Sequence, residues 1–334
     1  MSILIKQAVL HILDPNVGMP ILSQKELDLS DEVYFFLEKL ITKFFEDENA
    51  KTAEFTRTDQ RLPEICRGLT HGLDFMAGSI EIANLLFTIM QANPSIVPAD
   101  LVCMLFSRAD QLYLGIFKLN YRTGYIHNVI SDAGVSANSL IKQQTVLPSE
   151  TQRLEEAAAI RLDDFQIRLV EKEYEINGTK DYYLSKLFLG CNGQLSNNQK
   201  ARLLEKATKK ISKKYYDDDF EKLARFRQAV AAEAENAAGI QMEQVVREVF
   251  RDDPPAQREY LEEVKKAGLV ETRVKLPEKL IAKRFGTQKI LTDTGVEINF
   301  PSDYFNNQEK LEFINNSDGT ISIVIKNVSK ISNK

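Results

Sequence analysis

The chain has 334 residues, with 43% hydrophobic residues, 27% charged residues and a formal net charge of −5. These values argue against a disordered chain and fit two or three globular domains. A protein that coats DNA by bulk electrostatics would be strongly basic, so any DNA contact must here be local, indirect or assembled by oligomerisation.

Residues 1–177 predict an N-terminal α+β domain with a mainly antiparallel sheet. The near-continuous apolar runs on either side of the turn at 107–110 predict a hairpin that is covered on both faces. The expected strands are 2–13, 99–106, 111–119, 141–147, 157–162 and 165–174. The expected helices are 31–45 and 72–91, and the stretches 46–60 and 124–138 are expected to be loops.

Residues 178–268 predict a helical region, and residues 269–334 predict a C-terminal region of antiparallel β-hairpins. Asp253 followed by Pro254 is typical of a helix N-cap and first helical position. Thr-Gly and Asp-Gly turns between β-branched runs indicate two hairpins. The expected helices are 181–189, 197–215, 218–238, 241–250 and 254–267, and the expected strands are 288–292, 296–300, 310–314 and 320–326.

The segment 181–215 reverses the acidic character of the chain. Ser196 and Gln199 predict a capping box at the start of its last helix, and the apolar stripe of that helix is Leu204, Ala207, Ile211 and Tyr215. The basic residues of the helix are Lys200, Arg202, Lys206, Lys209, Lys210, Lys213 and Lys214. Lysines bind phosphates as point charges, and a single arginine does not indicate base reading. An ordinary solvated face is the alternative, which the acidic run 217–219 favours.

Other features favour structural roles. The Gly190–Gly193 loop matches neither the G-x-G-x-x-G nor the P-loop pattern, so a turn after a helix is favoured over a nucleotide site. Cys66, Cys103 and Cys191 lie too far apart to predict a disulfide framework or a structural zinc site. Neither a signal peptide nor a membrane span is expected, and the patterns predict a cytoplasmic protein.

Three segments carry a resemblance to a known family: the opening strand Ile5–His11, the segment Asp181–Leu204, and the strand Gly295–Phe300 (GVEINF). In this order they resemble the 37-kDa nucleoid-associated protein family of bacteria, and the chain is identified as a divergent member over its full length. The resemblance implies a protein located at the bacterial nucleoid. It supplies no catalytic residue and no cofactor.

Three other functions are open. A metal-dependent nuclease would use a carboxylate cluster with a nearby lysine, and its best candidates are Asp163, Asp164, Glu171, Lys172 and Glu173. A winged-helix reader would place residues 254–267 in DNA, although this helix is near neutral. A protein-interaction scaffold without DNA contact would fit the acidic total and the edges of the C-terminal strands.

The three histidines do not predict a catalytic site. His11 is expected to be a structural histidine on its strand, His71 could help to cap the next helix, and His127 lies in an expected loop, free for chemistry. We therefore expect a non-enzymatic α+β protein without cofactor or metal. It would bind DNA weakly and without sequence specificity, away from membranes, as a homo-oligomer, with a dimer favoured.

Overall fold

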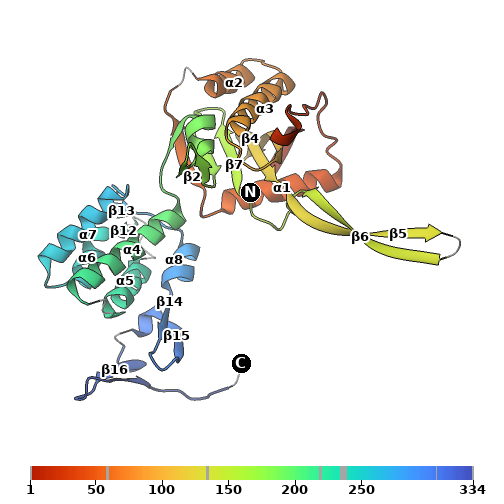
Figure 1. The fold of residues 1–334 in the computed structure, drawn as a ribbon. Coiled ribbons are helices and arrows are strands. Elements are labelled where there is room, and N and C mark those ends of the chain that lie inside the picture. Colours follow the sequence, from red (N-terminus) through yellow and green to blue (C-terminus); the bar gives the residue numbers. More distant parts are fainter. Residues whose placement is uncertain are drawn as a thin grey trace. The chain divides into compact units, whose positions relative to one another are not determined.

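The computed structural model describes residues 2–57, 60–132, 135–217, 220–233, 239–305 and 307–332. The chain forms two compact units, Met1–Gln194 (unit 1) and Leu195–Lys334 (unit 2) (Figure 1). The predicted α+β class is confirmed: an antiparallel sheet with helices comes first, helices follow, and antiparallel strand pairs end the chain. The finer division predicted at residues 177 and 268 stays a prediction.

Unit 1 is built on a seven-stranded sheet in which every neighbouring pair is antiparallel. Its three longest strands are the edge strand β1, from the opening segment, and the two strands of the predicted hairpin beside it. In spatial order the strands are β1 (Ile3–Leu13), β3 (Ala99–Arg108), β4 (Gln111–Asn120), β7 (Glu156–Arg161), β8 (Ile167–Val170), β2 (Lys51–Phe55) and β11 (Cys191–Gly193). A short hairpin, β9 (Tyr174–Ile176) with β10 (Thr179–Asp181), stands apart from this sheet.

Helices cover both faces of the sheet, which explains the continuous apolar runs of β3 and β4. Because side chains alternate along a strand, Leu101 and Cys103 pack on one face while Val102 and Met104 pack on the other. The first face carries α2 (Arg61–Thr70), α3 (Phe75–Ala92) and the π-helix η2 (Leu184–Leu189), and the second carries α1 (Asp31–Glu46). Burying one such aliphatic side chain contributes about 1.5–3 kcal/mol, so the covered hairpin anchors the unit.

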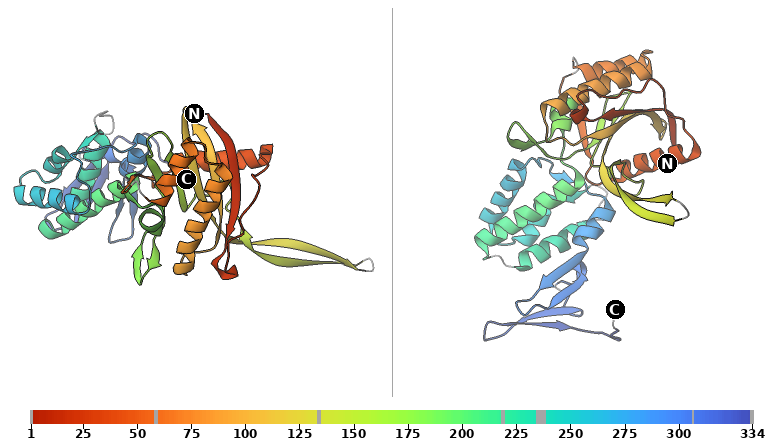
Figure 2. Two further views of the ribbon diagram at one scale, coloured as in Figure 1. Left: turned by 90° about the horizontal axis from the view of Figure 1, so that it is seen from above. Right: turned by 45° about the vertical axis from the view of Figure 1, so that its right-hand side comes forward.

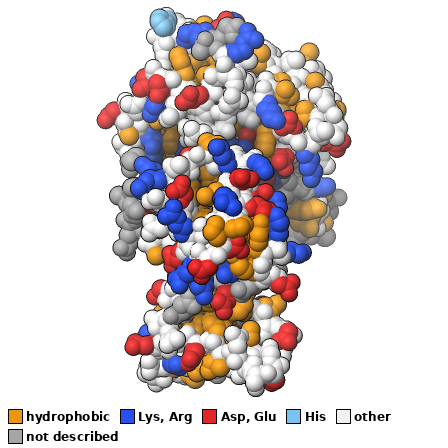
Figure 3. Space-filling model, turned by 90° about the vertical axis from the view of Figure 1, so that its left-hand side faces the viewer, with side chains coloured by type: hydrophobic (Ala, Val, Ile, Leu, Met, Phe, Trp, Pro, Cys, Tyr) orange, Lys and Arg blue, Asp and Glu red, His pale blue; other side chains and the backbone are white. Residues whose placement is uncertain are grey.

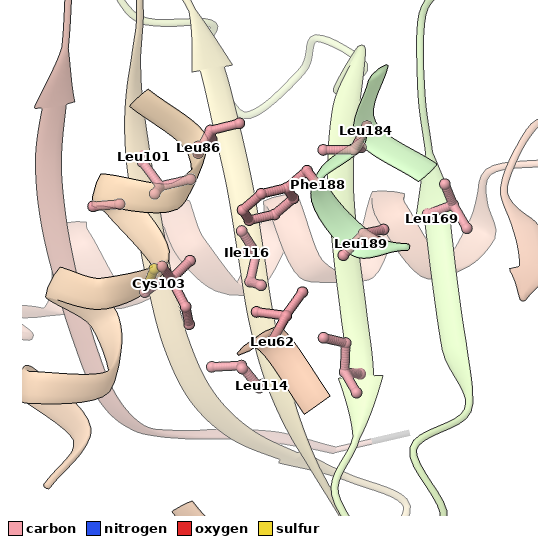
Figure 4. Packing of buried hydrophobic residues seen from close by; sticks show 14 of the residues in the cluster. Leu62, Leu86, Leu101, Cys103, Leu114, Ile116, Leu169, Leu184, Phe188 and Leu189 are labelled. Atoms are coloured by element: carbon pink, nitrogen blue, oxygen red, sulfur yellow. The ribbon is translucent and has the colours of Figure 1, made fainter. Parts of the chain in front are cut away.

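The segment η2 closes the first face of the sheet. Figure 4 shows Phe188 and Leu189 of η2 beside Ile116 of β4, and all three are buried in one cluster. An α-helix was predicted over 181–189, but the structure has a π-helix over Leu184–Leu189 that ends at Gly190 in the left-handed conformation, with φ of 60°. A glycine adopts this conformation without the steric cost of a Cβ.

Helix α3 is the one helix in the described ranges that is long and apolar enough to cross a membrane by length and composition. Such helices also form the cores of soluble proteins, and this one packs on the sheet of unit 1. Its buried side chains include Ile82, Leu86 and Met90, which belong to the same cluster as Leu101 of β3. The free cysteines Cys66 and Cys103 are also buried in this cluster, together with Cys191 (at β11).

Two of the predicted loops are wrong. Residues 46–60 contain β2, whose short KTAEF pattern pairs with β8 and β11. Of the predicted loop 124–138, the described residues 124–132 and 135–138 lie in two paired strands, β5 (Arg122–Asp132) and β6 (Val135–Val146), outside the main sheet. This ribbon contains many polar side chains because neither of its faces is fully buried, so it lacks the apolar contrast that marks a strand. The strand predicted at 165–174 is divided between β8 and β9.

The described residues of unit 2 begin with five helices around one core. They are α4 (Asn197–Tyr215), α5 (Phe220–Ala232), α6 (Met242–Val249), α7 (Pro254–Lys266) and α8 (Glu278–Phe285), and α8 was not predicted. Two two-residue strands in this helical region, β12 (Ile240–Gln241) and β13 (Arg273–Val274), pair with each other in antiparallel register. The predicted N-cap is confirmed, since the Asp253 carboxylate accepts a hydrogen bond from the Ala256 amide at 2.9 Å.

Both predicted C-terminal hairpins are present. Their strands are β14 (Thr287–Leu291) with β15 (Glu297–Pro301), and β16 (Leu311–Asn315) with β17 (Ile321–Ile325). They share a small cluster in which Phe300, Phe305 and Leu311 are buried against Ala224 of α5. The helices and the hairpins of unit 2 are thus in contact through α5.

Candidate nucleic-acid interface

Helix α4 begins where the sequence predicted. The Ser196 hydroxyl accepts a hydrogen bond from the Gln199 amide at 3.1 Å, and the Gln199 side chain accepts one from the Ser196 amide at 2.9 Å. This reciprocal pair satisfies two of the amide groups that a helix start leaves without a partner. The predicted capping box is therefore confirmed, and it fixes the register of every basic residue that follows.

The apolar stripe of α4 packs into the core of unit 2. Leu204, Ala207 and Ile211 are buried there, and Tyr215 is half-buried. The hydroxyl of Tyr260 on α7 donates to the Leu204 carbonyl at 3.2 Å, which joins the two helices at the level of this stripe. The opposite side of α4 is left facing solvent, as the sequence predicted.

Three of the seven basic side chains of α4 are held by carboxylates of unit 2. The ammonium of Lys200, which is largely buried, donates to both oxygens of Glu271 at 2.9 and 3.1 Å. Lys210 pairs with Glu263 at 2.7 Å. Lys214 pairs with Glu259 at 2.6 Å, and this hydrogen bond raises the pKa of Lys214. Their charges are neutralised within the unit.

The other four basic side chains are exposed, and within the described ranges they have no ion-pair partner. We call them the free stripe: Arg202, Lys206, Lys209 and Lys213. Their spacing of i, i+4, i+7 and i+11 keeps them within about 60° of one another around the helix and along about 17 Å of its axis. The structure thus divides the predicted cationic face into a straight row of free charges and a paired flank.

The surroundings of the free stripe are mixed in sign. On α4, Glu205 accepts from Arg227 of α5 and Arg284 of α8 at 3.5 and 3.1 Å, and all three side chains are half-buried. Of the acidic run 217–219, Asp217 is exposed, and Asp218 and Asp219 lie outside the described residues. On the face drawn in Figure 3, basic and acidic side chains are interspersed. A positive field can therefore only be local.

A family model described as nucleoid-associated protein YejK matches residues 9–332, nearly the whole chain. The chain belongs to this family. No curated protein matches it. The resemblance predicted from the three sequence segments is confirmed, since the match includes the whole of Asp181–Leu204 and Gly295–Phe300.

In this family member, the carboxylates considered for a nuclease have structural partners. Asp163 and Asp164 pair with Arg161 in an exposed turn. The buried Glu171 side chain pairs with Lys51 at 2.9 Å and accepts from the Ser185 amide at 3.0 Å, which holds the start of η2. Glu171 and Glu173 were predicted to lie on the strand 165–174. This prediction is wrong, because β8 ends at Val170 and both residues follow it. The part of the chain that the structure describes has no group of three or more His, Cys, Asp or Glu placed to hold a metal.

The glycine loop serves the fold of this family member. Gly190 caps η2, its amide donating to the Ser185 carbonyl, and the next three residues form β11 against β2. The predicted helix cap is therefore confirmed, whereas the residues expected to form a turn are a short strand.

The histidines occupy three different environments. His11 is buried, its Nδ1 accepts from the Ser23 amide at 3.1 Å, and its Nε2 lies 3.1 Å from the Ser79 hydroxyl. Burial lowers the pKa of His11 to about 4, so it is neutral, and its structural role is confirmed. His71 does not cap α3, because Asp74 accepts from the Ala77 amide there. His127 lies exposed on β5 and not in a loop.

The winged-helix outline is weakened by the side chains of α7. Its acidic residues Glu259 and Glu263 face α4, where they hold Lys214 and Lys210. A recognition helix needs its exposed face for bases, but this part of α7 packs along α4. The α7 carboxylates therefore belong to the paired flank of the candidate interface.

A buried polar cluster in unit 1 was not found from the sequence. Lys118 of β4 lies directly opposite Glu156 of β7, and its ammonium donates to the carboxylate at 3.0 Å. Asn120 and Tyr174 also donate to Glu156 at 2.7 Å, and the buried Tyr183 hydroxyl donates to its other oxygen. Burial lowers the pKa of Lys118, and Glu156 offsets part of that shift. The one available signal was a lysine inside the apolar run of β4.

Proposed function

We propose that this nucleoid-associated protein binds DNA directly, through phosphate contacts made by the free stripe. The supporting observation is that four cations on one exposed side of α4 have no carboxylate partner in the described ranges, whereas the three beside them do. An unpaired surface ammonium can bind a phosphate without first breaking an internal ion pair. The predominance of lysine supports binding without base specificity.

The size of the free stripe implies weak binding. Each phosphate that is neutralised on duplex DNA contributes about −0.9 to the slope of log K against log salt concentration, so four contacts give about −3.6. Non-specific affinities of this kind correspond to dissociation constants of about 10⁻⁴–10⁻⁶ M at physiological salt. Such binding suits an acidic protein whose DNA contact is confined to one helix face.

The test compares two double variants of equal charge. Lys206→Gln with Lys209→Gln removes two cations of the free stripe, and Lys210→Gln with Lys214→Gln removes two cations of the paired flank. The first variant should reduce the magnitude of the salt slope by about 1.8, and the second should leave it nearly unchanged. Binding to one duplex is measured by fluorescence anisotropy over a salt series.

Equal losses in both variants would show that only net charge matters and would refute contact through the free stripe. No loss in either variant would favour the second candidate, a protein-interaction scaffold at the nucleoid. That candidate is supported by the exposed apolar side chains of the C-terminal hairpins, among them Leu291, Val296, Ile321 and Ile325.

The proposed role is non-enzymatic and located at the cytoplasmic nucleoid. Asp163, Asp164 and Glu171 hold structural partners, which supports a binding role over hydrolysis. Incubation of the purified protein with supercoiled DNA and Mg²⁺ or Mn²⁺ tests this. Intact DNA is the expected result, and cleavage that co-purifies with the protein would refute the non-enzymatic role.

A further inference from the structure

The β5–β6 ribbon projects from the body of unit 1 (Figures 1 and 2). The two strands pair only with each other, in antiparallel register from Arg122 opposite Val146 to Asp132 opposite Val135. At about 3.4 Å per residue, the 11 residues of β5 extend roughly 35 Å. We call this ribbon the arm.

Each face of the arm carries exposed large apolar side chains among its polar ones. Tyr125, Val129 and Leu140 share one face, and Ile126, Ile130 and Ile141 share the other, as the pairing register requires. All six side chains are strongly exposed, with exposed fractions of 66% for Tyr125 and 74% for Leu140. A two-stranded ribbon without further packing is marginally stable at best in water. The sequence of the arm therefore indicates a partner that covers it.

The charge of the arm decides which class of partner fits. Its strands contain only three charged residues, Arg122, Asp132 and Lys142, with a net charge of +1. An arm that grips DNA needs cations for the phosphates, so DNA is a poor fit. Both edges of the arm also expose backbone donors and acceptors. Lysines on an edge strand oppose pairing with a further strand, and the two strands together contain a single lysine, Lys142. The surface fits another protein with apolar faces and a free strand edge.

We propose that the partner is a second copy of this chain, with the two arms lying side by side in opposite directions about a two-fold axis. Two identical ribbons are self-complementary in this arrangement, since each presents the same apolar faces and edges to the other. The large apolar side chains of the arm expose on the order of 700 Å² over its two faces together, so the ~800 Å² that each partner buries in a standard interface is approached only when the partner's arm covers both faces.

The root of the arm offers a place for the far end of the partner's arm. Val17, Met19 and Ile21 are exposed there. Beside them is a pocket of about 230 Å³ that is also lined by Tyr121 and Thr145, at the base of the two strands, and by the carboxylates Asp14 and Asp100. In opposed arms, the Val129 and Ile130 end of one arm reaches the exposed Val17, Met19 and Ile21 of the other. The same contact occurs twice in the dimer.

The experiment measures the mass of the full-length protein in solution by sedimentation over a concentration series. The arm variant combines Leu140→Glu and Ile141→Glu, which place one carboxylate on each face. The matched control combines Leu291→Glu and Val296→Glu, at exposed apolar positions of the β14–β15 hairpin in unit 2.

All four side chains are exposed, so folding should be unchanged, which circular dichroism checks. Wild type and control should dimerise, and the arm variant should dissociate at least ~100-fold more readily, because a buried unpaired carboxylate costs several kcal/mol.

A monomeric wild type, or an arm variant that dimerises as tightly as the control, would overturn the proposal. An arm variant that remains dimeric but loses DNA affinity would also overturn it and assign the arm to DNA. The proposal is independent of the free stripe on α4, since the Lys206→Gln/Lys209→Gln variant should still dimerise. Failure of DNA binding and failure of dimerisation are therefore distinguishable.

Discussion

The buried cluster around Glu156 gives a quantitative prediction for unit 1. Among the described residues, Lys118 is the one cation in contact with Glu156, so Lys118→Met leaves the carboxylate with three neutral donors, from Asn120, Tyr174 and Tyr183. Removing one partner of a buried ion pair costs about 3–5 kcal/mol, because the remaining charge is desolvated without compensation. Domains are stable by only about 5–15 kcal/mol, so this is a large share of the total.

Glu156→Gln should also destabilise unit 1, by about 3 kcal/mol, since its amide group cannot accept hydrogen bonds from all four donors. In the Glu156→Gln background, however, the buried carboxylate is replaced by a neutral amide. The loss of Lys118 then no longer leaves a buried charge unpaired. The double variant should therefore be about 2 kcal/mol more stable than the sum of the single effects implies.

The assay is hydrogen exchange of the amides of β4 and β7, which reports the opening free energy of the unit that contains them. Amides of α4 in unit 2 provide an internal control and should exchange at the wild-type rate. If the two single effects add within about 0.5 kcal/mol, the carboxylate and the ammonium do not depend on each other, and the reasoning is refuted.

Two further predictions concern unit 1. The pKa of His11 is about 4 when folded and near 6.5 when unfolded, so its stabilisation is complete above pH 6.5 and is lost as the pH falls toward 4, by about 3 kcal/mol. Urea unfolding at pH 7 and pH 4.5 should show a smaller loss for His11→Gln than for wild type, and equal losses would contradict a neutral buried imidazole. Gly190→Ala should cost more than Gly178→Ala, for which about 1 kcal/mol is expected, because both glycines have positive φ but a Cβ at Gly190 alone would meet the Gln60 side chain. Equal melting temperatures would contradict that contact.

Helix α4 was predicted well because its signals are local. The capping box lies within four residues, and the apolar stripe follows the helical period, so both could be read from consecutive residues. The pairing of Lys210 with Glu263 could not, since these residues are 53 positions apart and meet only when α7 packs on α4. For this reason the seven basic residues formed a single set in the sequence and two sets in the structure.

The missed elements have a common physical origin. The arm contains Gly124 and many polar side chains, and its strands are stabilised by backbone pairing to each other and not by a buried face. The π-helix η2 depends on burial of Phe188 and Leu189 and on the left-handed Gly190, which a helical period does not reveal. Lys118 looked like an interruption of an apolar strand because its partner Glu156 lies 38 residues away.

The three cysteines allow the two units to be followed separately. Cys66, Cys103 and Cys191 are all the cysteines of the chain, and all three are in unit 1. Burial raises the pKa of each thiol to about 12, so the reactive thiolate is scarce while the unit is closed. Alkylation of the native chain therefore proceeds only as often as unit 1 opens. The alkylation rate of the unmodified protein thus measures how often unit 1 opens, and unit 2, which has no cysteine, does not contribute to this rate.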